Sequence, residues 1–122
     1  MIKSIHHASL IISDLEKSRA FYQDVLGLQI DEGRPELGFD GLWLKVGEQQ
    51  IHLLLLDNPD PTEGRPEHGG RDRHIALTVN NFEQFVDQLE QANMPYSRSR
   101  SGRQALFCRD PDGNALEFIG TN

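Results

Sequence analysis

Four side chains that can bind a metal ion fall into two matched pairs along the sequence. His7 and His74 occupy the same place in similar stretches, and His74 follows His7 by 67 positions. Their later partners, His52 and Glu117, are 65 positions apart. Imidazole and carboxylate groups are ligands of divalent transition metals such as Zn, Ni, Co, Fe and Mn. We therefore expect an internal duplication whose halves jointly supply His7, His52, His74 and Glu117 to one metal.

His7 and His74 each lie in a stretch that alternates with the period of a β-strand. Residues 4–12 place His7 on one face, and residues 73–79 do the same for His74. The opposite faces are apolar and are expected to pack under a helix; they comprise Ala8, Leu10 and Ile12 in one stretch and Ile75, Leu77 and Val79 in the other. The two histidines are thus predicted to lie on the faces away from the helices.

A helix is predicted after each of these strands. Ser13 with Glu16 has the spacing of a capping box, and Gly27 is a plausible stop for the first helix. The second helix is expected at about 82–92, before Met94-Pro95. Three further short strands follow each helix, so each half is predicted to be a βαβββ module.

The predicted fold class is α+β, with the two βαβββ modules forming half-open barrels. We expect one domain over residues 1–122, made of a first module at 1–57, a linker loop at 58–71 and a second module at 72–122. The linker is rich in proline and glycine, which favours a loop.

The other polar candidates have weaker patterns. The strand period places His6 toward the helix, and His68 lies in the Gly/Pro-rich loop, where solvation is expected. His52 lies in a nearly continuous apolar strand, so it could be a direct ligand or a partner that supports one. The loop arginines could be solvated or could bind a carboxylate or phosphate; they are Arg65, Arg71 and Arg73.

Several apolar residues also have two possible roles. Trp43, Phe39 and Phe107 could line the mouth of a pocket or could pack in the core. Cys108 is the only cysteine, which excludes an intrachain disulfide, and it is predicted to be a small core residue.

Composition and charge narrow the class of partner. The formal net charge is −7, which argues against nucleic acid and anionic membranes. The start of the sequence has no signal-peptide pattern, and no apolar run approaches the ~20 residues that span a bilayer. We therefore expect a cytoplasmic protein that acts on a small molecule.

Four segments resemble the vicinal oxygen chelate superfamily, which includes glyoxalase I, methylmalonyl-CoA epimerase, fosfomycin-resistance enzymes, extradiol dioxygenases and bleomycin-resistance proteins. They are Ile5–Leu10, Asp14–Tyr22 with Val25–Leu28, Arg73–Leu77 and Arg109–Glu117. The resemblance implies paired βαβββ modules around a divalent metal and a homodimer. It implies that His7, His74 and Glu117 are ligands, whereas His52 stands where glyoxalase I has a glutamate.

The function that this resemblance favours is a metal-dependent lyase or isomerase of glyoxalase type. Its substrate would bind the metal through two adjacent oxygens, and Glu117 would move a proton. One alternative is an extradiol-type ring-cleaving dioxygenase. Another is a non-catalytic resistance protein that binds a drug or metabolite, and a further enzyme option is a thiol transferase that opens an epoxide antibiotic.

Overall fold

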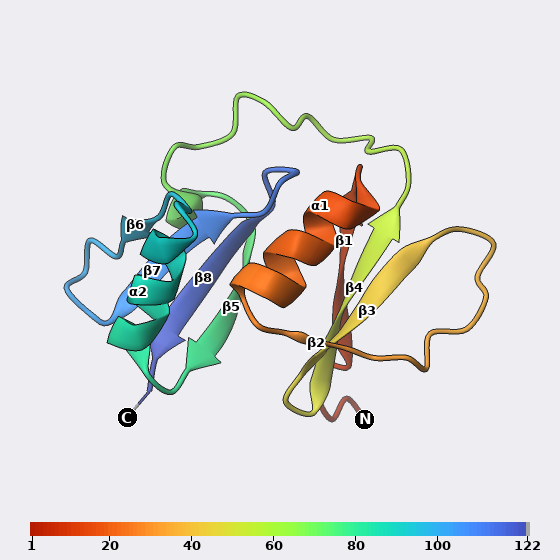
Figure 1. Cartoon of the computed structure of the whole chain (residues 1–122), viewed down its shortest axis with the longest axis horizontal. Coiled ribbons are helices and arrows are strands. Elements are labelled where there is room, and N and C mark those ends of the chain that lie inside the picture. Colours follow the sequence, from red (N-terminus) through yellow and green to blue (C-terminus); the bar gives the residue numbers. More distant parts are fainter. Residues whose placement is uncertain (122) are drawn as a thin grey trace. The chain divides into compact units, whose positions relative to one another are not determined.

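The computed structural model describes residues 1–121 and divides the chain into two compact units, Met1–Asp60 and Pro61–Asn122. Each unit contains one four-stranded mixed sheet and a helical segment (Figure 1). The boundary at 60–61 lies within the segment 58–71 that we expected to be a linker. Among the described residues, no helix is both long enough and apolar enough to cross a lipid bilayer.

Both units have the predicted βαβββ order, and the α+β fold class is confirmed. The first unit contains β1 (His7–Ile12), α1 (Leu15–Arg19), the π-helical turn η1 (Ala20–Val25), β2 (Gln29–Ile30), β3 (Gly41–Val46) and β4 (Gln49–Leu55). The second unit contains the 3-10 turn η2 (Gly69–Arg71), β5 (His74–Val79), α2 (Phe82–Gln91), β6 (Ser97–Arg98), β7 (Ala105–Arg109) and β8 (Ala115–Gly120).

The two sheets have the same topology. Their strand orders are β1-β4-β3-β2 and β5-β8-β7-β6, and in each sheet the first strand runs parallel to the last. Ser9 pairs with His52 in one sheet, and Ala76 pairs with Glu117 in the other. His7 and His74 lie two residues before these pairs, so in each sheet both candidate ligands project from the same face. The repeated register shows that the duplication extends to individual residues.

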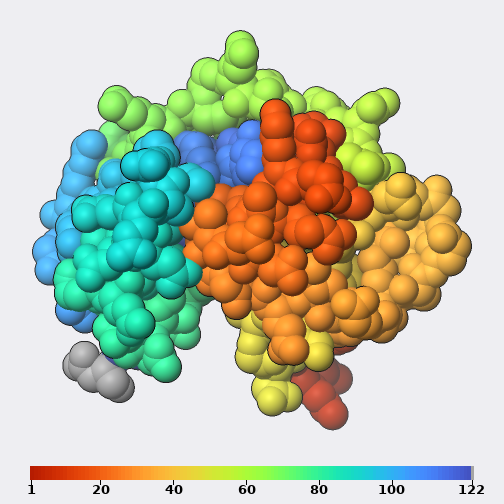
Figure 2. Space-filling model, viewed as in Figure 1, coloured from red at the N-terminus to blue at the C-terminus, as the bar shows by residue number. Residues whose placement is uncertain are grey.

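Apolar side chains pack the helix of each unit against its sheet. In the first unit the largest fully buried side chains include Tyr22, Leu44 and Leu53. In the second unit α2 lies across one face of the sheet (Figure 1), and the atoms of this helix cover much of the second unit in the view of Figure 2. The ring centroids of Phe85 in α2 and Phe118 in β8 are 4.6 Å apart. The side of α2 that faces the sheet is apolar, and its four large side chains are buried: Phe82, Phe85, Val86 and Leu89.

The first helix begins one residue later than its sequence suggests. Asp14, rather than the predicted Ser13, is the N-cap, and its Oδ1 accepts a hydrogen bond of 2.9 Å from the Lys17 backbone N–H. Aspartate is as good a cap as serine and places a negative charge at the positive end of the helix. The helix ends as predicted, because Gly27 has a φ of 77°, a left-handed conformation that glycine adopts without strain.

Cys108 lies in β7 and is only 4% exposed, which confirms its predicted place in the core. Burial, together with a smaller contribution from the charge of Asp110, raises the pKa of its thiol to about 12. Above the pKa of an unfolded cysteine, about 8.5, only the unfolded chain loses this proton. We therefore expect the free energy of unfolding to fall with pH, by up to about 1.4 kcal/mol per unit from this group alone.

Urea denaturation at several values between about pH 9 and pH 10.5 tests this expectation. The variant Cys108→Ala should have a shallower dependence on pH than the wild-type chain, whatever its absolute stability. Parallel curves for the two proteins would show that the thiol titrates alike in the folded and unfolded states.

Candidate functional site

His74 and Glu117 form one half of the candidate site, on the paired strands β5 and β8. The Nε2 atom of His74 is 3.2 Å from Oε1 of Glu117. The other carboxylate oxygen, Oε2, accepts a hydrogen bond of 2.6 Å from the Arg103 guanidinium. Glu117 is only 4% exposed, so its charge depends on these two partners for compensation.

The other ring nitrogen of His74 is held by the backbone. Its Nδ1 lies 2.9 Å from the carbonyl oxygen of Asp72. A carbonyl oxygen only accepts, so the hydrogen belongs to Nδ1 and the ring plane is fixed. This arrangement turns Nε2 toward Glu117 and is the usual support of a histidine that binds a metal.

Asp72 is fixed in turn by two arginines. Arg65 donates hydrogen bonds to its carboxylate, including one of 3.1 Å from Nε. Arg109 donates another, of 2.8 Å, from Nη1. Arg65, followed by Arg109, holds the pKa of Asp72 well below its usual range despite partial burial. Arg65 therefore forms an ion pair within its own unit instead of presenting its guanidinium to an external anion. Arg71 and Arg73, the other two loop arginines, are exposed.

His7 and His52 form the second half, on the paired strands β1 and β4. The His52 ring lies between two other rings: Trp43 on one side, with centroids 4.1 Å apart at 4°, and His7 on the other, at 3.9 Å and 16°. His52 is 8% exposed, whereas His7 is exposed. Burial lowers the pKa of His52, and the neighbouring charges of His7 and His6 lower it further. His52 is thus favoured as a neutral ring, the form that binds a metal.

A line of hydrogen bonds leads from His52 toward β2. Its Nε2 atom is 2.9 Å from Oε1 of Gln50, and Nε2 of Gln50 donates to Oδ2 of Asp31 at 2.7 Å. Backbone N–H donation from Gly33, at 2.9 Å, lowers the pKa of Asp31. The candidate ligand His52 therefore has its own supporting partners, as His74 does.

Two histidines differ from the sequence expectation. His6 precedes β1 and is exposed; its Nδ1 lies 2.8 Å from Nδ1 of His7 instead of facing the helix, because the strand alternation does not extend to it. His68 is half-buried rather than solvated. Its Nδ1 accepts from the Gly70 N–H at 3.0 Å, and its ring meets that of Phe107 edge to face.

The comparisons with known proteins identify the family of the chain. The family model described as the Glyoxalase/Bleomycin resistance protein/Dioxygenase superfamily matches residues 4–118. The chain belongs to this superfamily. The resemblance seen in the sequence is confirmed, and so is the fold that it implied.

Two relatives and one solved structure show which kinds of protein the chain is similar to. Glyoxylase I 4 of Arabidopsis thaliana is 33% identical over 123 residues, which cover 96% of this chain and 70% of that protein. Metallothiol transferase FosB of Lysinibacillus sphaericus (strain C3-41) is 31% identical over 126 residues, covering 96% and 82%. A protein of Bacillus anthracis described as a member of the glyoxalase family has a TM-score of 0.84 at 25% identity, covering 100% and 98%. These matches establish the superfamily and the fold of the chain. The names of the relatives describe different reactions.

The four candidate ligands lie in two pairs, one pair in each unit. Within each unit of the described chain, no three side chains of His, Cys, Asp or Glu are grouped so that they could hold a metal ion. The pairs are His7 with His52, whose rings stack, and His74 with Glu117, whose polar atoms are in contact. Neither pair alone completes a site for a transition metal, which takes four or more ligands.

Sequence reasoning missed three residues that support these pairs. Gln50 lies two positions before His52 in β4, so strand parity could have identified it as a neighbour on the same face. Asp72 precedes β5 and supports His74 through its backbone carbonyl, which the strand period does not predict. Arg103 gave no such signal. It lies in the loop before β7 and reaches Glu117 only through its long side chain.

Proposed function

We propose that the chain is a divalent-metal-dependent enzyme of glyoxalase type, a lyase or isomerase. Its substrate is a small molecule that binds the metal through two adjacent oxygens. The observation that carries the proposal is the contact of 3.2 Å between His74 Nε2 and Glu117 Oε1. His7 and His52 occupy the equivalent register positions in the other sheet, where their rings stack. The proposed metal ligands are His7, His52, His74 and Glu117.

The donor atoms suit such a metal. Ligand atoms that lie 2.0–2.2 Å from an ion are about 3 Å apart when they subtend a right angle. The His74–Glu117 separation of 3.2 Å therefore needs little adjustment. Three imidazoles and one carboxylate favour Zn, Ni, Co or Fe over Mg or Ca. Since each sheet contributes only two of these groups, we propose that both pairs serve one ion.

The protein groups around the ion define the proposed mechanism. A bound metal would polarise the substrate carbonyl and so make the neighbouring C–H acidic. Glu117 would take the proton from that carbon and return it to the adjacent one. Arg103 would keep the Oε2 side of the carboxylate occupied, which leaves the side next to His74 for the chemistry. Burial of Glu117 would limit proton exchange with water.

The relatives support this proposal and one competitor. Similarity to Glyoxylase I 4 favours the isomerase or lyase reading. Similarity to Metallothiol transferase FosB favours a second candidate, in which the metal would activate an epoxide toward attack by a thiol. The remaining alternatives are a ring-cleaving dioxygenase and a non-catalytic binding protein. We also propose a homodimer, which light scattering on the purified protein would check.

One set of assays on the untagged protein tests the proposal. Elemental analysis after gentle purification should find about one transition-metal ion per chain, the stoichiometry of one shared site. The metal-loaded protein should convert the hemithioacetal of methylglyoxal and glutathione, or another α-hydroxycarbonyl compound, and chelation should abolish turnover. Thiol consumption with an epoxide would favour the FosB-like candidate instead. Oxygen uptake with catechol would favour the dioxygenase, and absence of metal with tight ligand binding would favour the binding protein.

A further inference from the structure

The orientation of the Gln50 side chain follows from the groups on either side of it. Asp31 accepts from the Gly33 N–H through Oδ1 and from the Gln50 amide through Oδ2. An ionised carboxylate has no hydrogen to donate, so the NH₂ end of Gln50 must face Asp31. The amide oxygen therefore faces His52.

The hydrogen position on His52 follows from the same reasoning. An amide oxygen only accepts hydrogen bonds, so the contact of 2.9 Å between Gln50 Oε1 and His52 Nε2 requires the hydrogen to be on Nε2. In a neutral ring this leaves the lone pair on Nδ1. The stacked rings of Trp43 and His7 leave His52 little freedom to turn out of this plane.

We propose that Asp31 and Gln50 are positioning residues that hold His52 as its Nε2–H tautomer, so that Nδ1 is the atom it offers to a metal. At His74 the support is on the other nitrogen, because Nδ1 donates to the Asp72 carbonyl and Nε2 is turned toward Glu117. The two supports thus hold different nitrogens, Nε2 of His52 and Nδ1 of His74, and leave the other nitrogen of each ring for ligation. The metal-binding role rests on the proposed function, whereas the tautomer is a property of the metal-free chain.

Long-range ¹H–¹⁵N correlation spectra of the metal-free, ¹⁵N-labelled protein test the proposal. We expect the pattern of an Nε2–H tautomer for His52 and a hydrogen on Nδ1 of His74. Gln50→Leu should remove the preference at His52. The matched control is Gln49→Leu, because Gln49 is the exposed neighbour of Gln50 in β4 and lies on the other face of the strand.

Zinc affinity, measured by competition with a chelator, provides the second readout. The loss of a partner that orients a ligand typically weakens binding about 10–100-fold. We expect a loss of this size for Gln50→Leu and none for Gln49→Leu, with both variants folded by near-ultraviolet circular dichroism. A His52 tautomer with the hydrogen on Nδ1, or one that Gln50→Leu leaves unchanged, would overturn the proposal. Failure of the wild-type chain to bind zinc would instead refute the proposed function and the metal-facing role of Nδ1.

Discussion

Replacing Glu117 by glutamine is expected to lower the affinity of the chain for Zn²⁺ or Ni²⁺ by about 100-fold or more. Glu117 is the only carboxylate in the proposed ligand set, and the substitution removes its charge while keeping its shape. Loss of a supporting partner alone costs about 10–100-fold, and loss of a charged ligand should cost at least as much. Equilibrium competition with a chromophoric chelator at neutral pH measures the change.

A matched control separates this effect from a general change of charge. Glu83 in α2 is exposed and pairs with Arg98 at 3.3 Å, so Glu83→Gln makes the same chemical change away from the candidate site. We expect its metal affinity to equal that of the wild-type chain. Equal affinities for all three proteins would remove Glu117 from the ligand set, and equal losses in both variants would indicate a nonspecific electrostatic effect.

The largest loss of stability is expected for Asp72→Ala. Asp72 is held by Arg65 and Arg109 with its side chain 6% exposed, and the substitution leaves both guanidinium groups without this partner. Removal of one partner from a buried ion pair costs about 3–5 kcal/mol. Because both arginines are partly exposed and regain some hydration, we expect roughly 2–4 kcal/mol here. Urea denaturation with a two-state analysis measures the free energy of unfolding.

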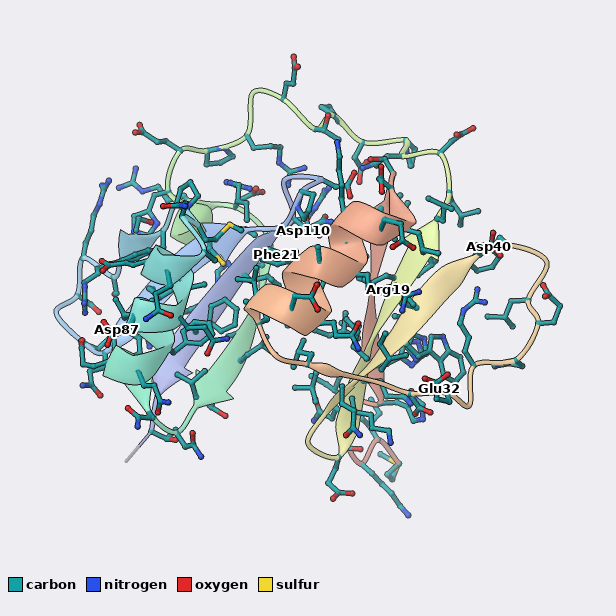
Figure 3. The ribbon with its side chains drawn as sticks, viewed as in Figure 1. Arg19, Phe21, Glu32, Asp40, Asp87 and Asp110 are labelled. Carbon is teal, nitrogen blue, oxygen red and sulfur yellow. The ribbon has the colours of Figure 1, made fainter. Side chains whose placement is uncertain are left out.

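Two further variants make this result specific. Asp72→Asn keeps a hydrogen-bond acceptor of the same size and should lose less than Asp72→Ala. Asp87 lies on the outer side of α2 (Figure 3) and is exposed, so Asp87→Ala should stay within about 0.5 kcal/mol of the wild-type value. If Asp72→Ala were no more destabilising than Asp87→Ala, the Asp72 ion pairs would contribute nothing to the stability of the second unit.

The elements and their register could be predicted because they follow from hydrophobic periodicity. The alternation around His7 and His74 identified the apolar faces of β1 and β5, and the pairing with β4 and β8 places the two candidates of each sheet on one face. The duplication then placed the partners of both histidines. His52 was harder to place than Glu117, because nearly every residue of β4 is apolar and its alternation is weak.

The contacts between side chains could not be predicted from periodicity. The choice of Asp14 over Ser13 as the helix cap depends on backbone geometry at one residue, and both types are good caps. His68 is half-buried because the turn η2 places its ring against Phe107, a contact between segments far apart in the sequence. Arg103 reaches Glu117 from an irregular loop. Such contacts depend on where loops come to rest in three dimensions.

The stacking of Trp43 on His52 gives this protein a built-in optical reporter. Trp43 is the only tryptophan, so all indole emission of the chain comes from a ring 4.1 Å from the candidate ligand. The yield and wavelength of that emission depend on the charge and motion of whatever touches the indole. Fluorescence of the unlabelled protein should therefore register events at His52 in real time, without a dye or a coloured metal.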